Sequence, residues 1–195
     1  IEENGPYLAT GKHNLIMEAI CPEIAAKLGN ALCAPVVKFV PEGNFEPPSG
    51  AMNFPGSISL SAETYEAMLT DIVRSMQVGG FKDIVMIGDS GGNQRGMGNV
   101  AERLNQMWAD TDVRVHFVRE FYSPGWENTE DYTEEEFGLI QTQNDGYHDD
   151  IWVTAMMMVI DPEQVRYRQR VNAGLASING IDIYPLEDTI VLGEK

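Results

Sequence analysis

The feature that most constrains the fold is a glycine-rich turn between a strand-like run and a helix-like run. Residues 83–88 are mostly apolar and short, as expected of a buried strand. Residues 88–93 read Gly-Asp-Ser-Gly-Gly-Asn, and a helical pattern follows from about Arg95 to Trp108. A strand that leads through a tight turn into a helix is typical of layered α/β folds. In such folds ligands bind beyond the carboxyl ends of the strands.

The same alternation of helix-like and strand-like runs extends along the chain. The other predicted helices are Leu15 to Leu28 with Asn14 as N-cap and Pro22 as a kink or break, a helix capped by Ser61 and ended by Gly79, and Ile151 to Ile160. The other predicted strands are Ala31 to Val40, Val113 to Val118 and Thr189 to Leu192. The acidic stretch 123–146 is predicted to be a solvated face or loop. The order predicts an α/β fold with a mostly parallel sheet.

Composition narrows the class of protein. The chain has 195 residues with 13 Lys and Arg against 30 Asp and Glu, so its formal net charge is −17. Such acidity argues against a nucleic-acid partner or an anionic membrane surface. The length predicts a single domain over residues 1–195, and 43% hydrophobic residues exclude a disordered chain. No apolar run approaches the roughly 20 residues that span a bilayer.

The start of the chain and its cysteines leave the compartment open. The first residue is Ile1 rather than Met, so we expect an upstream segment, together with any targeting signal it carries, to be absent from this sequence. Cys21 and Cys33 are too few for a disulfide framework, although one bridge is compatible with them. Both a cytoplasmic and a periplasmic location are compatible with these features.

The turn at residues 88–93 has more than one interpretation. Its Gly-Asp-Ser-Gly-Gly matches the trypsin-like protease signature, but that fold is all-β and needs an upstream catalytic histidine, whereas His13 lies in a different context. It also fits the Gly-x-Ser-x-Gly nucleophile elbow, which stands between a strand and a helix. In that case Ser90 is the nucleophile and His148 its base.

Four segments in register point to a third interpretation. Residues 2–13 follow the pattern E-Q-H-G-P-H-L-P-L-x-T-D, and residues 54–60 follow F-P-G-T-I-S-L. Residues 80–93 follow G-F-x-x-I-x-x-x-N-G-H-G-G-N, and residues 148–155 follow H-A-G-x-x-E-T-S with Pro162 beyond. Over most of residues 1–166 the chain therefore resembles the creatininase (creatinine amidohydrolase) family.

The resemblance implies a fold, an activity and a cofactor. The expected fold is a three-layer α/β/α sandwich with a mostly parallel sheet, commonly in a homo-oligomer. The expected activity is hydrolysis of an amide or cyclic amide C–N bond in a small-molecule substrate. A divalent metal, zinc or manganese, would activate water and polarise the carbonyl.

The family's ligand positions are altered in this chain. Glu2 keeps the first acid, but Asn4, His13, Ser90 and Val153 stand where the family has histidine, aspartate, histidine and glutamate. Neighbouring acids can compensate, since Asp89 adjoins the turn position and Asp149 lies one helical turn before the last one. The rebuilt metal site is predicted from Glu2, His13, Asp89 and Asp150, and the catalytic residues from His148, Ser90 and Asp149.

Three functions therefore remain open at this point. The first is a creatininase-like hydrolase with a rebuilt divalent-metal site. The second is a metal-free serine hydrolase that uses Ser90 and His148. The third is a non-catalytic member of the family that serves in binding or assembly.

Overall fold

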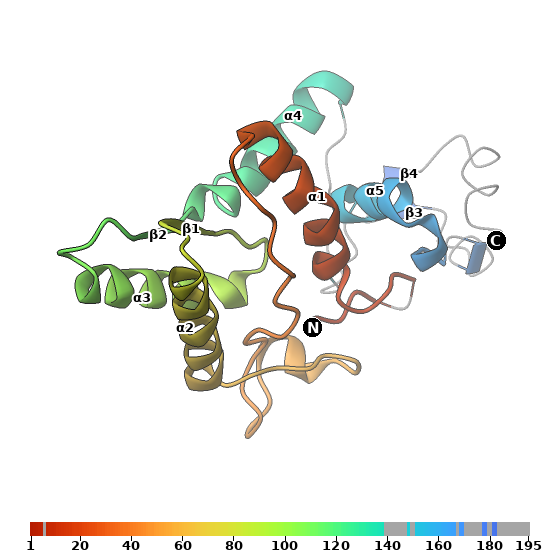
Figure 1. Cartoon of the computed structure of the whole chain (residues 1–195). Helices are drawn as coiled ribbons and strands as arrows, with labels where there is room; N and C mark the ends of the chain where they lie inside the picture. Colours follow the sequence, from red (N-terminus) through yellow and green to blue (C-terminus); the bar gives the residue numbers. More distant parts are fainter. Residues whose placement is uncertain are drawn as a thin grey trace. The chain divides into compact units, whose positions relative to one another are not determined.

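A computed structural model describes residues 1–5, 7–138, 148, 151–166, 168–169, 177–178 and 181–182 of the chain. They divide into two compact units, which Figure 1 shows as one ribbon. Unit 1 consists of Ile1–Lys38, Phe54–Ser57 and Asn128–Lys195, and unit 2 consists of Phe39–Asn53 and Ile58–Glu127. Each unit is described by itself below.

Unit 2 contains the parallel pairing that the sequence predicts. Strands β1 (Asp83–Met86) and β2 (Arg114–Phe117) pair in parallel, with Ile84 opposite Val115. Helix α3 (Gly91–Met107) connects them, as a parallel pair requires. Helix α2 (Ala62–Val78) precedes β1 and packs against α3. The predicted strand–turn–helix at residues 83–108 is therefore confirmed, with the helix beginning four residues earlier than predicted.

The packing of α2 against α3 depends on a close approach of the two helices. Tyr65 of α2 is buried, and a Cβ atom added at Gly96 of α3 would lie 2.6 Å from its ring. The predicted cap of α2 is also present, since the backbone N–H of Thr64 donates to the Ser61 hydroxyl at 3.2 Å. Together these contacts bury the apolar faces of both helices against the strands.

Unit 1 is built on two helices that pack together. Helices α1 (Lys12–Leu28) and α5 (Ile151–Ile160) are in contact, and Ile16 and Met157 are buried in them. Leu8, ahead of α1, forms an isolated antiparallel bridge with Val165. This bridge ties the N-terminal loop to the segment after α5.

Helix α1 begins earlier than predicted. Gly11 adopts the left-handed conformation, with φ of 78°, and the helix starts at the next residue, so Asn14 lies inside the helix rather than at its cap. Pro22 is accommodated within one helix, which ends at Gly29 with φ of 77°. The predicted stop is therefore confirmed, whereas the predicted start is wrong by three residues.

The strand predicted for residues 31–40 is wrong. The structure describes all ten residues and assigns no regular element to them, and most are exposed or half-buried. Pro35 lacks an N–H for a ladder, and Cys33 is bonded to Cys21 with a Cα–Cα distance of 5.6 Å. Despite its apolar composition, this segment therefore enters no sheet.

The remaining elements are short or exposed. The acidic stretch forms helix α4 (Gly125–Phe137), which has no buried residue. Smaller elements are the 3-10 helices η1 (Gly50–Asn53), η2 (Arg119–Phe121) and η3 (Pro162–Gln164) and the antiparallel strands β3 (Ser177–Ile178) and β4 (Ile181–Asp182). The strand predicted at residues 189–192 lies outside the described residues.

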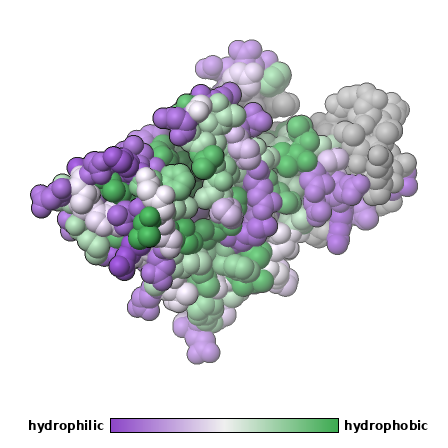
Figure 2. Space-filling view, viewed as in Figure 1, coloured by the Kyte–Doolittle hydropathy of each residue, from purple (hydrophilic) through white to green (hydrophobic). Residues whose placement is uncertain are grey.

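Apolar and hydrophilic side chains are interspersed on the visible face in Figure 2. Leu32 and Val78 are among the large apolar residues that are exposed, and single exposed apolar residues are normal on a protein surface. Within the described part of the chain, no helix is long and apolar enough to cross a membrane.

Candidate functional site: a buried ionic cluster

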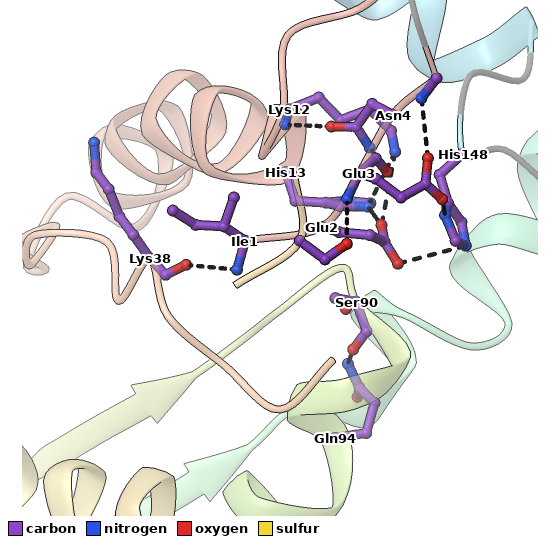
Figure 3. Close-up of polar contacts among 12 residues, drawn as sticks. Ile1, Glu2, Glu3, Asn4, Lys12, His13, Lys38, Ser90, Gln94 and His148 are labelled. Atoms are coloured by element: carbon purple, nitrogen blue, oxygen red, sulfur yellow. Dashed lines mark hydrogen bonds and ion pairs between the residues drawn. The ribbon is translucent and has the colours of Figure 1, made fainter. Parts of the chain in front are cut away.

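Five ionisable side chains of unit 1 lie together at the start of α1. They come from the N-terminal loop, from the first turn of α1 and from the residue range just before α5, and in Figure 3 they point toward one another. We call them the N-terminal cluster; its members are Glu2, Glu3, Lys12, His13 and His148.

Asn4 holds the loop that carries the two carboxylates. Its side-chain amide donates to the backbone carbonyl of Glu3 at 2.7 Å, and its amide oxygen accepts the backbone N–H of Lys12 at 3.0 Å. The backbone N–H of Gly11 also donates to the carbonyl of Glu2 at 2.9 Å. These local bonds fold the loop onto the first turn of α1, so the loop residues of the cluster are held beside its helix residues.

Glu2, His13 and Lys12 form the inner part of the cluster. Nε2 of His13 lies 2.8 Å from Oε2 of Glu2, which is a short hydrogen-bond distance. Nζ of Lys12 lies 3.8 Å from the same carboxylate oxygen and 3.3 Å from His13 Nε2. The shorter contact assigns the ring proton to Nε2, which donates it to Glu2, and Lys12 supplies a second positive charge beside that carboxylate.

These positive groups keep Glu2 ionised. Burial alone would raise the pKa of the Glu2 carboxyl, because the charged form loses its hydration. The hydrogen bond from His13 and the charges of His13, Lys12 and His148 outweigh burial and hold the pKa below its usual value. Glu2 is therefore a buried carboxylate at neutral pH.

Glu3 and His148 form the outer part of the cluster. Nδ1 of His148 lies 2.8 Å from Oε1 of Glu3, and its Nε2 lies 3.4 Å from Oε1 of Glu2. Glu3 is itself fixed, since its other carboxylate oxygen accepts the backbone N–H of Gly5 at 3.0 Å. The His148 side chain is 45% exposed, whereas the Glu3 side chain is 4% exposed. A buried carboxylate thus orients an imidazole that solutes can reach.

The glycine turn of unit 2 has a different character. Ser90 precedes α3 with extended backbone angles, and within the described turn its side chain makes no capping bond to the helix. The Gln94 amide nitrogen donates to the carbonyls of Gly88 and Ser90 at 2.8 and 3.0 Å. A Cβ atom at Gly92 would lie 1.8 Å from the carbonyl oxygen of Pro41. Gly92 therefore serves close backbone packing.

The predicted site residues fall into three groups. Glu2, His13 and His148 are brought together in unit 1, as the resemblance implied. Asp89 and Ser90 lie in unit 2 and are buried there. Asp149 and Asp150 lie outside the described residues, so their roles stay predictions.

Glu3 and Lys12 are members of the cluster that the sequence prediction missed. Relative to the family pattern, both are gains of charge: Glu3 stands at a glutamine position and Lys12 at a threonine position. The sequence did hold a signal for this cluster. It gains one acid and one base within the short segment that carries the first family motif. Val153, at the family's glutamate position, is instead buried in α5 as part of the core.

The donor set does not fit the divalent metal that the family implies. Zinc ligands lie about 2.0–2.2 Å from the ion, and every ligand must be an electron-pair donor. Glu2 and His13 provide two such atoms, but the Lys12 ammonium, a cation without a free electron pair, lies beside both of them. Among the described residues, no group of three or more His, Cys, Asp or Glu has a geometry that could hold a metal ion.

Several solved structures have a fold similar to that of this chain. One described as a mutant creatininase of type II has a TM-score of 0.60 at 21% identity, covering 84% of this chain and 63% of that one. "Creatininase Mn" has a TM-score of 0.63 at 21% identity, covering 94% and 71%. A mutant creatininase described as Zn-Zn type has a TM-score of 0.61 at 20% identity, covering 94% and 70%. The chain thus spans only part of the length of each of these structures, 63% in the first of them.

The parallel β1–α3–β2 arrangement and these similarities define an α/β protein with the creatininase fold, so the predicted fold class is confirmed. The family model described as creatinine amidohydrolase matches residues 1–187. The chain therefore belongs to the creatininase family. None of the curated protein sequences compared with the chain matches it.

Proposed function

We propose that this chain is a hydrolase that cleaves the C–N bond of a small amide or cyclic amide, with His148 as the residue that moves the proton. One observation carries the proposal: a half-exposed imidazole is held at 2.8 Å by a buried carboxylate, next to a second buried carboxylate. A buried carboxylate that orients an imidazole is a recurring device of general base catalysis. Membership of the creatininase family supports the substrate class.

The chemistry follows from the ring atoms of His148. Its Nδ1–H donates to Glu3, so the lone pair is on Nε2. Nε2 takes a proton from a water molecule, and the water oxygen attacks the amide carbon. The proton then passes from Nε2 to the amide nitrogen, the C–N bond breaks, and a carboxylic acid and an amine result. While it carries the proton, the ring lies 2.8 Å from Oε1 of Glu3 through Nδ1 and 3.4 Å from Oε1 of Glu2 through Nε2.

An alternative form of this hydrolase uses a rebuilt divalent-metal site made of Glu2, His13, Asp89 and Asp150. The contact between Glu2 and His13 is what supports it. It differs from the metal-free form in requiring a bound ion for activity, which metal analysis of the purified protein decides. A homo-oligomer and a single domain over residues 1–195 remain proposals, for which sedimentation and limited proteolysis are the measurements.

The serine hydrolase is less well supported. A nucleophile elbow places its serine on a sharp, strained turn. Ser90 instead has φ of −117° and ψ of 140°, which is unstrained extended backbone. The position of Ser90 between a strand and a helix is the feature that still supports this alternative.

The experiment that tests the proposal is a ring-opening assay with two histidine variants. The purified chain is incubated with a panel of five- and six-membered cyclic amides, creatinine included, and gain of one water is followed by mass spectrometry. His148→Gln removes the proposed base. His116→Gln is the matched control, because Nε2 of His116 also lies 2.8 Å from a carboxylate, Asp83, but on the exposed side of unit 2.

We expect the wild type and His116→Gln to open at least one ring at similar rates. His148→Gln should be slower by a factor of about 10²–10⁴, the usual contribution of a general base. Equal rates in both variants would assign the proton transfer to another group. No turnover of any substrate by the folded wild type would favour the non-catalytic interpretation.

A further inference from the structure

Lys12 is an unusual residue for the position that it occupies. Its side chain is 1% exposed, and its ammonium faces the carboxylate of Glu2 and the ring of His13. Lysine is almost never fully buried unless it is paired. Removing an ammonium from water is unfavourable even after the protein relaxes, so a folded chain keeps one inside only where nearby negative charge offsets the loss.

The cluster contains that negative charge. Glu2 is ionised and lies 3.8 Å from the ammonium, and Glu3 adds a second carboxylate to the same loop. Figure 3 shows both acids on the stretch of loop beside the first turn of α1. Lys12 adds a covalently attached positive charge to those that His13 and His148 bring to Glu2. The ammonium therefore lies where the loop concentrates negative charge.

The sequence changes around Lys12 act in the same direction. The family pattern has threonine at this position and aspartate at the next, and here they are Lys12 and His13. One neutral group has become a cation and one anion has become an imidazole, which moves the charge of this pair of positions in the positive direction. A divalent ion supplies positive charge in the relatives described as "Creatininase Mn" and Zn-Zn type.

We propose that the Lys12 ammonium is the built-in cation of the N-terminal cluster and stands in for the divalent ion of the metal-containing relatives. This inference rests on the proposed function only in taking the cluster as the site. The ammonium is covalently attached, carries one charge and offers only donors, so it holds Glu2 in place without coordinating substrate or water. Lys12 is thus a positioning residue rather than a catalytic residue.

The test measures metal content and does not depend on activity. The wild type, Lys12→Thr and Lys38→Thr are dialysed against zinc or manganese, washed free of loosely bound ion and analysed by mass spectrometry of the metal. Lys12→Thr restores the residue of the family pattern and removes the ammonium. Lys38→Thr is the matched control, because Lys38 is paired with Glu18 at 2.6 Å but its side chain is 50% exposed.

We expect less than about one tenth of an equivalent of metal in the wild type and in Lys38→Thr, and a metal content several times higher in Lys12→Thr. A stoichiometric metal in the wild type would overturn the inference. A folded Lys12→Thr that gains no metal would overturn it as well, because the ammonium would then not be what keeps the ion out. Neither result bears on whether the chain hydrolyses amides.

A second measurement applies if Lys12→Thr does not fold. The Nζ resonance of Lys12 is followed by nitrogen NMR in the wild type while zinc is added. The inference requires a protected ammonium signal that zinc leaves unchanged up to millimolar concentration and that Glu2→Gln shifts. Displacement of the signal at stoichiometric zinc would show that ion and ammonium exchange, and the inference would fail.

Discussion

The N-terminal loop of unit 1 and the glycine turn of unit 2 correspond to two motifs of the same family pattern. The two segments differ in which residue types of that pattern they retain. The loop has kept and added charged groups, since Glu2 remains and Glu3 and Lys12 are gained. The turn has kept only the last three residues of its motif, Gly91, Gly92 and Asn93, whereas Gly88, Asp89 and Ser90 stand in place of an asparagine, a glycine and a histidine. The loop is thus rich in charged side chains, whereas the turn is rich in glycine.

The contacts explain this difference. In the loop, side chains contact side chains, and each carboxylate has an imidazole nitrogen at 2.8 Å. In the turn, the Gln94 side chain satisfies backbone carbonyls, and Gly92 lets the Pro41 carbonyl approach where a Cβ atom has no room. Substitutions of the loop carboxylates should therefore change both reactivity and stability, whereas substitutions of the turn glycines should change stability alone.

Removing the charge of Glu2 should have the largest effect. Glu2→Gln leaves the Lys12 ammonium buried without its nearest carboxylate, so the free energy of unfolding should fall by about 3 kcal/mol. Ring opening by the folded fraction should fall by a factor of at least about 10². Urea unfolding and the ring-opening assay measure the two effects.

Glu18→Gln is the control for that substitution. Glu18 pairs with Lys38 on the surface, so its loss should cost less than about 1 kcal/mol and leave the rate unchanged. If Glu2→Gln and Glu18→Gln changed stability and rate equally, the ion pair of the loop would contribute no more than one on the surface.

Adding one methyl group to the turn should come next. Gly92→Ala places a carbon on the Pro41 carbonyl oxygen, and the backbone must shift, so unfolding of unit 2 should become easier by about 2–3 kcal/mol. Denaturant unfolding followed by circular dichroism measures the change. Gly29→Ala is a useful comparison, because a Cβ there meets nothing within 4 Å, although its positive φ still carries a cost of about 1 kcal/mol.

The fold was readable from the sequence where the periodicity was strong. The helix capped by Ser61 and the strand–turn–helix at residues 83–108 are present because apolar spacing, caps and glycines all agree there. The strand prediction for residues 31–40 failed because apolar composition alone does not distinguish a strand from an irregular segment bonded through Cys33. Local signals that agree are predictive, and a single signal is not.

The candidate site was readable only in part. Glu2, His13 and His148 were found because the family pattern places them in register. Lys12 and Glu3 were missed because a charged residue near a helix start is ordinarily exposed, and burial of an ammonium depends on neighbours that only the folded loop provides. The sequence shows which family ligands are replaced, whereas the burial of Lys12 beside Glu2 is seen only in the structure.

Lowering the pH should reduce the contribution of the Glu2 charge to the free energy of unfolding. The reduction should be smaller than the loss caused by Glu2→Gln at neutral pH. The folded protein holds the pKa of Glu2 below the usual value of about 4.3, so its contribution is complete above that pH. As the pH falls below it and passes the lower folded value, the carboxylate takes up a proton and the contribution disappears. The difference in unfolding free energy between wild type and Glu2→Gln should therefore shrink from about pH 5 toward about pH 2. A difference that stays constant over this range would mean that the Glu2 charge is not what stabilises the loop.

The smallest effect is expected at Ser90, and it is the most direct test of the comparison. Ser90→Ala removes a hydroxyl that makes no capping bond within the described turn, so the free energy of unfolding should change by less than about 1 kcal/mol. If the turn has kept only its shape, ring opening should fall less than about threefold and a fluorophosphonate should leave the serine unlabelled. Loss of turnover by a factor of about 10³ or more, together with labelling of Ser90, would assign the nucleophile to the turn. The roles of the two motifs would then be reversed, because the glycine turn would carry the chemistry and the charged loop would serve to hold the fold.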